Sequence, residues 1–101
     1  MEGKYGCDMR GMLSFQILFL LSKSSLCGEE LAKELEKRRG EKPKAGTIYP
    51  ALKDLSERGL IIGEKSGKTI VYSLTDSGKK AITEAKAYFC RCFGDILSEE
   101  K

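Results

Sequence analysis

A helical pattern ends abruptly in this chain, and a strand pattern begins directly after it. In KAGTIYPALKDLSERGL, residues 44–60, four apolar residues fall at the i, i+3, i+4, i+7 spacing of an amphipathic helix: Ile48, Ala51, Leu52 and Leu55. Gly59 stands where helices commonly stop. The runs LIIGEK and KTIVYSL follow at once, separated by Ser-Gly and rich in β-branched and aromatic residues, which predicts a β-hairpin. A helix that leads straight into a hairpin restricts the chain to few folds.

Three further helices complete the expected order. Residues 12–21 are almost all apolar, a second helix opens at Gly28 and stops at Gly40, and a last helix begins near Asp76 after a Thr75 cap. This predicts a mostly α fold with a small β-hairpin (α+β), a winged helix-turn-helix followed by a C-terminal helix. We expect a single domain over residues 1–101, with the winged helix at about 9–75 and the C-terminal helix at about 76–98.

The first helix is apolar on all sides, which indicates contacts from several directions and favours a second chain covering it. The run is too short to span a bilayer, and its flanks fit a signal peptide poorly. We therefore expect a cytoplasmic protein without a membrane partner. Lys and Arg exceed Asp and Glu by 18 to 15, too little to identify a partner by itself. The sequence has no His, the commonest general base and metal ligand, which disfavours an enzyme.

The stretch GTIYPALKDLSERGLI resembles the recognition-helix signature of the PadR family of transcriptional regulators. RGMLSFQILFLL, CGEELAKEL and VYSLTDSGKKAI resemble the family's first helix, second helix and wing, so the resemblance covers about residues 8–90. It implies a homodimeric winged-helix repressor that binds double-stranded DNA, with the C-terminal helix as the dimerisation element. Two recognition helices related by the dimer axis would read an inverted-repeat operator.

Basic and polar residues on the third helix and the hairpin are the expected DNA contacts. An ordinary solvated face is the alternative, but the basic hairpin beside this helix favours DNA. The expected DNA-binding residues are Lys44, Thr47, Tyr49, Pro50, Lys53, Lys65 and Lys68. Lysines would bind phosphates, and Thr47 and Tyr49 would contact phosphates or bases.

The last helix carries an apolar seam at alternating spacings of three and four residues, typical of a coiled coil. The expected dimerisation residues are Leu13, Ile17, Ile82, Ala85, Phe89, Cys92, Phe93 and Ile96. A pocket for a small-molecule effector of unknown identity is an alternative use of Phe89, Phe93 and their neighbours.

Cys7, Cys90 and Cys92 raise a second hypothesis, a metal- or thiol-redox-responsive regulator with its thiols near the dimer interface. Residues two apart on a helix point to different sides, so inert thiols, no metal and no cofactor are the default prediction. A winged helix used as a protein-interaction module is the other alternative.

Pro50 lies inside the third helix, where it removes a backbone donor and crowds the preceding turn. We expect the helix to begin near Lys44 or Ala45 and to run through the proline, with a bent or open front turn. Gly46, without a β-carbon, is expected to ease the crowding.

Overall fold

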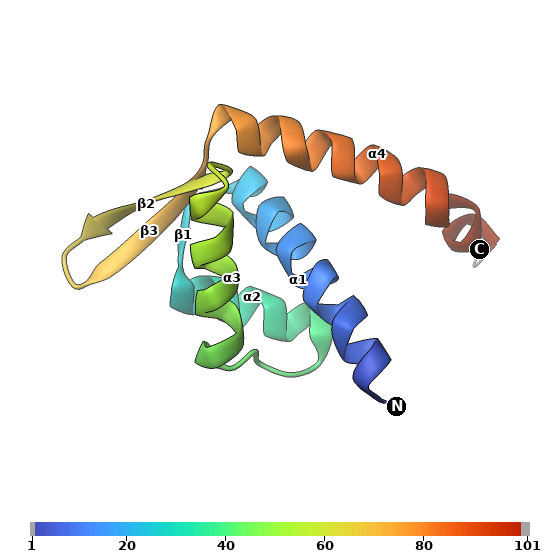
Figure 1. Cartoon of the computed structure of the whole chain (residues 1–101), viewed down its shortest axis with the longest axis horizontal. Helices are drawn as coiled ribbons and strands as arrows, with labels where there is room; N and C mark the ends of the chain where they lie inside the picture. The colour runs from blue at the N-terminus through green and yellow to red at the C-terminus, as the bar shows by residue number, and fades with distance from the viewer. Residues whose placement is uncertain (1, 100–101) are drawn as a thin grey trace.

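The computed structural model describes the backbone of residues 2–99 and the side chains of residues 12–98. The elements follow in the order α1 (Glu2–Lys23), β1 (Leu26–Cys27), α2 (Gly28–Arg39), α3 (Ala45–Glu57), β2 (Ile61–Ser66), β3 (Thr69–Leu74) and α4 (Asp76–Glu99). Helices α1, α2 and α3 form the body, the β2–β3 hairpin projects to one side, and α4 extends away from the hairpin base (Figure 1). The predicted α+β winged-helix order is confirmed.

The sheet has one more strand than the sequence predicts. β1 pairs antiparallel with β3, Leu26 opposite Tyr72 and Cys27 opposite Val71, which gives the strand order β1-β3-β2. Beside this short ladder the Ser25 and Ser73 hydroxyls are 2.7 Å apart and hydrogen-bonded. A strand of two residues is too short to show the alternation of apolar and polar residues that identifies strands in a sequence, so β1 is recognised only by its pairing with β3.

The core lies among the first three helices, and its fully buried side chains come from all of them: Leu13, Ile17, Leu31, Leu35, Ile48 and Leu52. Helix α1 packs against α2, α3, β3 and α4 of its own chain. Its own chain thus covers α1 only in part, since Phe15 and Phe19 are half-buried and Met12 is 37% exposed, and cover by a second chain stays a prediction. No helix in the described part of the chain is long and apolar enough to cross a membrane.

The end of α3 forms a left-handed stop that also anchors α4. Gly59 has a φ of 77°, and the Leu60 amide donates to the Leu55 carbonyl at 3.0 Å, as in a Schellman motif. The Thr75 hydroxyl donates to the Gly59 carbonyl at 2.6 Å and accepts the Gly78 amide at 3.0 Å. The predicted Thr75 cap is confirmed, and it also ties the first turn of α4 to the last turn of α3.

At the start of α2 the cap is Cys27 rather than Gly28, which is the first helical residue. The Cys27 amide, which has no acceptor within the helix, donates to the Glu30 carboxylate at 2.9 Å.

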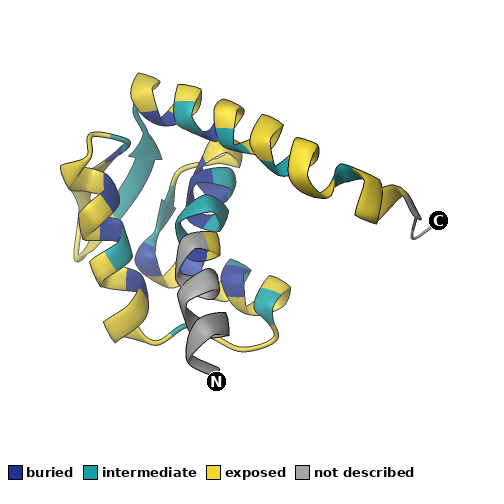
Figure 2. Cartoon of the chain, turned by 45° about the vertical axis from the view of Figure 1, so that its right-hand side comes forward, coloured by how far each residue is buried: buried dark blue, intermediate teal, exposed yellow. Residues whose placement is uncertain are grey.

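Burial decreases steadily along α4. Ile82 is buried and Ala85 and Phe89 are half-buried, whereas Phe93 and Ile96 are exposed. Figure 2 shows the C-terminal half of this helix as mostly exposed, beyond the body of the molecule. The seam predicted from the sequence is thus covered by its own chain at one end and open at the other.

Candidate nucleic-acid interface

Helix α3 presents a polar face on the side away from the core. Ile48, Leu52 and Leu55 are buried, whereas Thr47, Pro50 and Lys53 are exposed. Lys44 is the N-cap, with the extended dihedrals φ −77° and ψ 155°, and its carbonyl accepts the amides of Thr47 and Ile48. The helix therefore begins where the sequence predicts, and it continues through Pro50.

Gly46 does not have the role expected of it. A β-carbon built on Gly46 would meet nothing within 4 Å, so the missing side chain relieves no crowding around Pro50. A proline ring clashes with the carbonyl oxygen four residues earlier, which every residue type carries. Gly46 is instead an exposed, side-chain-free position in the first turn of α3, where another molecule can approach the backbone closely.

The N-terminus of α3 differs electrostatically from those of α2 and α4. Glu29 and Glu30 lie in the first turn of α2 and Asp76 in that of α4, but the first turn of α3 has no acidic residue. The positive end of the helix dipole, together with Lys44 at the cap, is therefore left uncompensated there. Such an end favours an anion such as phosphate.

Tyr49 is less free than the sequence suggests, because its ring lies on the first turn of α2. A β-carbon on Gly28 would stand 2.5 Å from the Tyr49 hydroxyl oxygen and 2.9 Å from two ring carbons. The ring remains 48% exposed. Tyr49 thus connects α3 with α2 while keeping about half of its surface open.

A groove of about 270 Å³ joins this tyrosine to the hairpin. Its lining brings together residues far apart in the sequence: Cys27, Gly28, Glu29, Tyr49, Lys68, Thr69, Ile70 and Tyr72. Burial raises the pKa of the Tyr72 hydroxyl, and the nearby Tyr49 raises it further. The sequence pattern did not identify Gly28, Thr69 or Tyr72 as neighbours of Tyr49; the small residue at the start of α2 was the one available signal.

The hairpin tip carries the two predicted wing lysines, and both are exposed. Ser66 pairs with Thr69 around a tight turn in which Gly67 has a φ of 65°. The Thr69 hydroxyl donates to the Ser66 carbonyl at 3.1 Å, which fixes the turn. Lys68 reaches the groove beside Tyr49, while Lys65 lies one residue before the turn, on β2.

The predicted DNA-contacting lysines are not neutralised by the side chains that the structure describes. The ion pairs among those side chains join Glu34 to Lys37 and Arg38, Glu29 to Lys42, and Asp54 to Arg58. The Lys42 ammonium holds the pKa of the Glu29 carboxyl below its usual value, and Glu29 raises the pKa of Lys42. Lys42 of the loop between α2 and α3 is thus paired with Glu29 of α2, whereas Lys44, Lys53, Lys65 and Lys68 have no such partner among the described side chains.

The residues predicted for dimerisation divide into two groups. Leu13, Ile17 and Ile82 belong to the core cluster and are covered by their own chain, so no surface of these side chains remains for a partner. The others lie along the more open part of α4: Ala85, Phe89, Cys92, Phe93 and Ile96. Phe89 stacks on Phe15 of α1 at 5.5 Å between ring centroids and contacts Phe93 at 5.0 Å, which forms a continuous aromatic face.

The cysteines do not form a metal centre within the described side chains. Cys7 lies outside the residues whose side chains are described, and the described part contains no group of three metal-ligating side chains. Cys90 lines an apolar cavity of about 310 Å³ with Phe15 and Phe89, whereas Cys92 lies beside Tyr88 and raises the pKa of its hydroxyl. The two thiols therefore lie in different surroundings, as their spacing predicts.

The structure has three packed helices, a hairpin directly after the third, and a basic surface across both whose lysines have no ion pair among the described side chains. These features define a winged-helix protein of the nucleic-acid-binding type. The model of the PadR-like family of transcriptional regulators matches residues 17–84. The chain belongs to the PadR-like family of transcriptional regulators. Members of this family are transcriptional regulators and not enzymes, in agreement with the prediction from the sequence.

Individual relatives agree with this assignment. The transcriptional activator GvpE1 of Halobacterium salinarum is 35% identical over 60 residues, which are 59% of this chain and 31% of that protein. The chain thus spans about a third of the length of this relative. A Thermoplasma acidophilum protein classed as a transcriptional regulator has a similar structure, with a TM-score of 0.72, 34% identity and coverage of 90% and 93% of the two chains. A PadR-like transcription factor from Bacteroides fragilis shares the fold, with a TM-score of 0.78 at 23% identity over 98% and 99% of the chains.

Proposed function

We propose that this protein is a homodimer that binds double-stranded DNA sequence-specifically and acts in the cytoplasm. The observation that carries the proposal is the acid-free N-terminus of α3, with Lys44 at its cap and the wing Lys68 beside Tyr49. An α-helix enters the major groove of B-DNA, and lysines on both sides of it bind backbone phosphates.

Each element of this surface has a distinct part in the proposal. Lys44, Lys53, Lys65 and Lys68 bind phosphates, while the exposed Thr47 and the open half of Tyr49 contact phosphates or base edges. Pro50 and the side-chain-free Gly46 keep the front of α3 narrow, so that its backbone approaches the DNA closely.

Dimerisation is proposed through the open half of α4. Phe93, Ile96 and Leu97 are exposed there and continue the aromatic face that Phe15 and Phe89 begin. An apolar face of this kind is stabilised when a second copy covers it. In this division of the chain, about 9–75 binds DNA and about 76–98 forms the dimer, so the operator is an inverted repeat.

Repression is the proposed mode of action, because it needs only occupancy of promoter DNA, which these two surfaces provide. Activation is the second candidate, favoured by the activator function in the name of the relative GvpE1. A reporter gene placed behind the selected operator distinguishes them: reporter output falls with a repressor and rises with an activator.

Selection of bound duplexes from a random pool tests the main proposal. We expect enrichment of an inverted repeat whose half-sites lie about one helical turn apart. Binding should weaken steeply with salt, because lysine–phosphate contacts release counterions. If no sequence is enriched, and if the fraction of duplex that the protein retains does not depend on salt, DNA binding is rejected and the protein-interaction module is favoured.

The thiol hypothesis has its own test in the same assay. The operator affinity is measured with reductant, with oxidant and with added Zn²⁺. If the cysteines are inert, the three values should be the same. The separate surroundings of Cys90 and Cys92 support inert thiols. A change of tenfold or more under any of these conditions would establish the redox- or metal-responsive alternative.

A further inference from the structure

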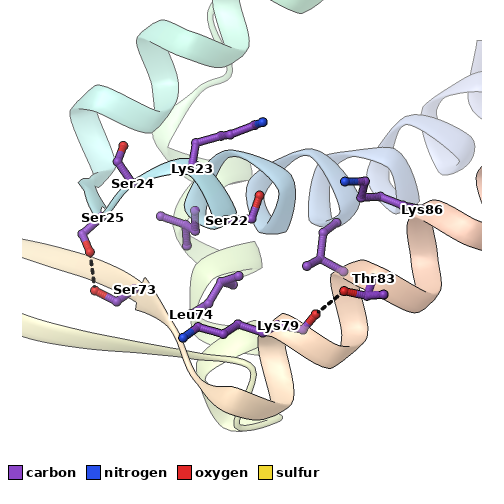
Figure 3. Close-up of a pocket in the computed structure, with 11 residues that line it drawn as sticks. Ser22, Lys23, Ser24, Ser25, Ser73, Leu74, Lys79, Thr83 and Lys86 are labelled. Carbon is purple, nitrogen blue, oxygen red and sulfur yellow. Dashed lines mark hydrogen bonds between the residues drawn. The ribbon is translucent and has the colours of Figure 1, made fainter.

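A cleft of about 430 Å³ lies on the side of the molecule where α1 ends and α4 begins. The end of α1, the residues that lead into β1, the last residues of β3 and the first turns of α4 form its walls (Figure 3). Its lining combines cations and hydroxyls over a small apolar floor: Leu21, Ser22, Lys23, Ser24, Ser25, Ser73, Leu74, Lys79, Ile82, Thr83 and Lys86. The described residues that line it include no carboxylate.

Three lysines bring positive charge to this cleft from two helices. The Lys23 ammonium lies 5.1 Å and the Lys86 ammonium 5.9 Å from the centroid of the Phe19 ring, so one aromatic ring holds a cation from α1 and a cation from α4. Lys79 comes from the second turn of α4 and extends beneath Leu74 (Figure 3). None of the three belongs to an ion pair within the described side chains. The cleft thus has three cations along its walls and no described counter-ion, which favours a bound anion.

The hydroxyl groups divide into committed and available donors. The Ser22 hydroxyl donates to the Phe19 carbonyl at 2.5 Å, and the Thr83 hydroxyl donates to the Lys79 carbonyl at 2.9 Å. The Ser25 and Ser73 hydroxyls share one hydrogen bond of 2.7 Å, which leaves one of their two hydrogens to donate elsewhere. Together with Ser24 and the three ammonium groups, this hydrogen gives the cleft several donors for one anionic group.

We propose that this cleft binds a small organic anion with a phosphate or carboxylate group. The lysines and the serine donors bind the anionic group, and the half-buried Leu74 contacts the carbon part of the ligand. The volume accommodates a metabolite-sized molecule, more than a bare inorganic ion requires.

The DNA backbone is the competing occupant, and the position of the cleft argues against it. Ser73 and Leu74 end β3, whereas the wing tip at Lys68 precedes the other end of this six-residue strand. At about 3.3 Å per residue, the cleft lies about 20 Å from the tip along the hairpin. A phosphate held at the wing tip is therefore not the group that enters the cleft.

A ligand in this cleft joins α1 to α4, because Lys23 belongs to one helix and Lys79 and Lys86 to the other. Its binding fixes the direction in which α4 leaves the body. This consequence rests on the proposed function: if α4 forms the dimer, the ligand changes the distance between the two α3 helices and thus the operator affinity. The binding step itself does not depend on DNA.

Titration followed by amide NMR spectra tests the binding step with three probes: 3-phosphoglycerate, inorganic phosphate and uncharged glycerol. We expect 3-phosphoglycerate to shift the amide signals of Ser24, Ser25 and Lys79, phosphate to bind more weakly, and glycerol to have no effect. Lys79→Ala and Lys86→Ala should each weaken binding about tenfold, the usual loss for a charge-assisted hydrogen bond. Lys80→Ala is the matched control, since Lys80 lies on the same helix but outside the cleft, and it should bind as the unmodified protein does.

Three results would overturn the proposal. The first is the absence of any shift with 3-phosphoglycerate at millimolar concentration. The second is equal affinity for 3-phosphoglycerate in all three variants. The third is a loss of operator affinity in Lys79→Ala and Lys86→Ala without any small-anion binding to the unmodified protein, which would assign the lysines to DNA. Thermal unfolding of each variant shows that the fold is intact. A chain that binds 3-phosphoglycerate but no DNA would reject the proposed function while leaving the anion site standing.

Discussion

The Tyr49 ring of α3 lies on Gly28 of α2, so closely that a β-carbon on Gly28 would stand 2.5 Å from the Tyr49 hydroxyl oxygen. The contact holds Tyr49, a residue of the proposed major-groove helix, in the groove that it shares with Lys68 of the wing. A Gly28→Ala change therefore pushes the ring aside. Because the ring is half exposed it has room to move, so we expect weaker operator binding, about tenfold, with little loss of thermal stability.

A double-mutant cycle separates this effect from others. In a Tyr49→Ala background the ring is absent, so Gly28→Ala should weaken operator binding no further. If Gly28→Ala weakens binding equally in both backgrounds, the ring contact is not the cause.

Two glycines of α4 should respond in opposite ways to the same substitution. A β-carbon on Gly78 would collide with the carbonyl of Leu60, whereas one on Gly94 would meet nothing within 4 Å. Gly78→Ala should lower the free energy of unfolding by more than about 2 kcal/mol, as other overpacked sites do. Gly94→Ala should raise it by about 0.5–1 kcal/mol, because alanine loses less entropy in a helix. Urea unfolding followed by circular dichroism measures both, and equal effects would contradict the predicted clash.

The Thr75 hydroxyl joins two elements, and its removal should cost more than that of a threonine within the helix. Thr75→Ala loses the cap on the Gly78 amide and the bond to the Gly59 carbonyl, a loss of about 1–2 kcal/mol. Thr83 is the control, since its hydroxyl donates only to the Lys79 carbonyl of its own helix, and Thr83→Ala should be nearly neutral. Denaturant midpoints compare the two variants. A similar loss in both would show that Thr75 does not connect α4 to the end of α3.

Salt dependence should distinguish the proposed phosphate contacts from other lysines. Lys53→Ala and Lys68→Ala should each weaken operator binding and reduce the slope of log affinity against log salt by about 0.9. Lys37→Ala is the control, because the Lys37 ammonium pairs with Glu34 at 3.2 Å, and its slope should not change. If the slopes of the Lys53→Ala and Lys68→Ala variants do not change, these two lysines do not contact DNA phosphates.

A charge added to the open apolar face of α4 should disrupt the dimer, whereas the same charge on another face of this helix should not. Ile96 is 56% exposed in the single chain, so Ile96→Glu costs little in its fold but places a charge in the proposed dimer interface. We expect the Ile96→Glu variant to sediment as a monomer and to lose its affinity for the inverted-repeat operator. Ser98→Glu adds the same charge at the last residue but one of α4, on another face of the helix, and this variant should remain a dimer. An Ile96→Glu dimer that binds the operator normally would place the interface elsewhere.

The sequence alone determined the order of the four helices and the hairpin, the end of α3 and the start of α4. The helical spacing of Ile48, Leu52 and Leu55, the left-handed stop at Gly59 and the cap at Thr75 are local effects, set by residues within one turn of each other, and the structure has each of them as predicted. The family resemblance is carried by the same local pattern, which is why it could be identified before any contact was known.

Only the tertiary structure decided what covers each face. The strand β1 exists because Leu26 and Cys27 meet Tyr72 and Val71, 45 residues or so further along the chain. The apolar α1 packs against four elements of its own chain, the ring of Tyr49 lies on Gly28, and Lys23, Lys79 and Lys86 line one cleft. Periodicity states which side of a helix is apolar, but not which partner lies against it, because long-range packing depends on how all the elements fit together.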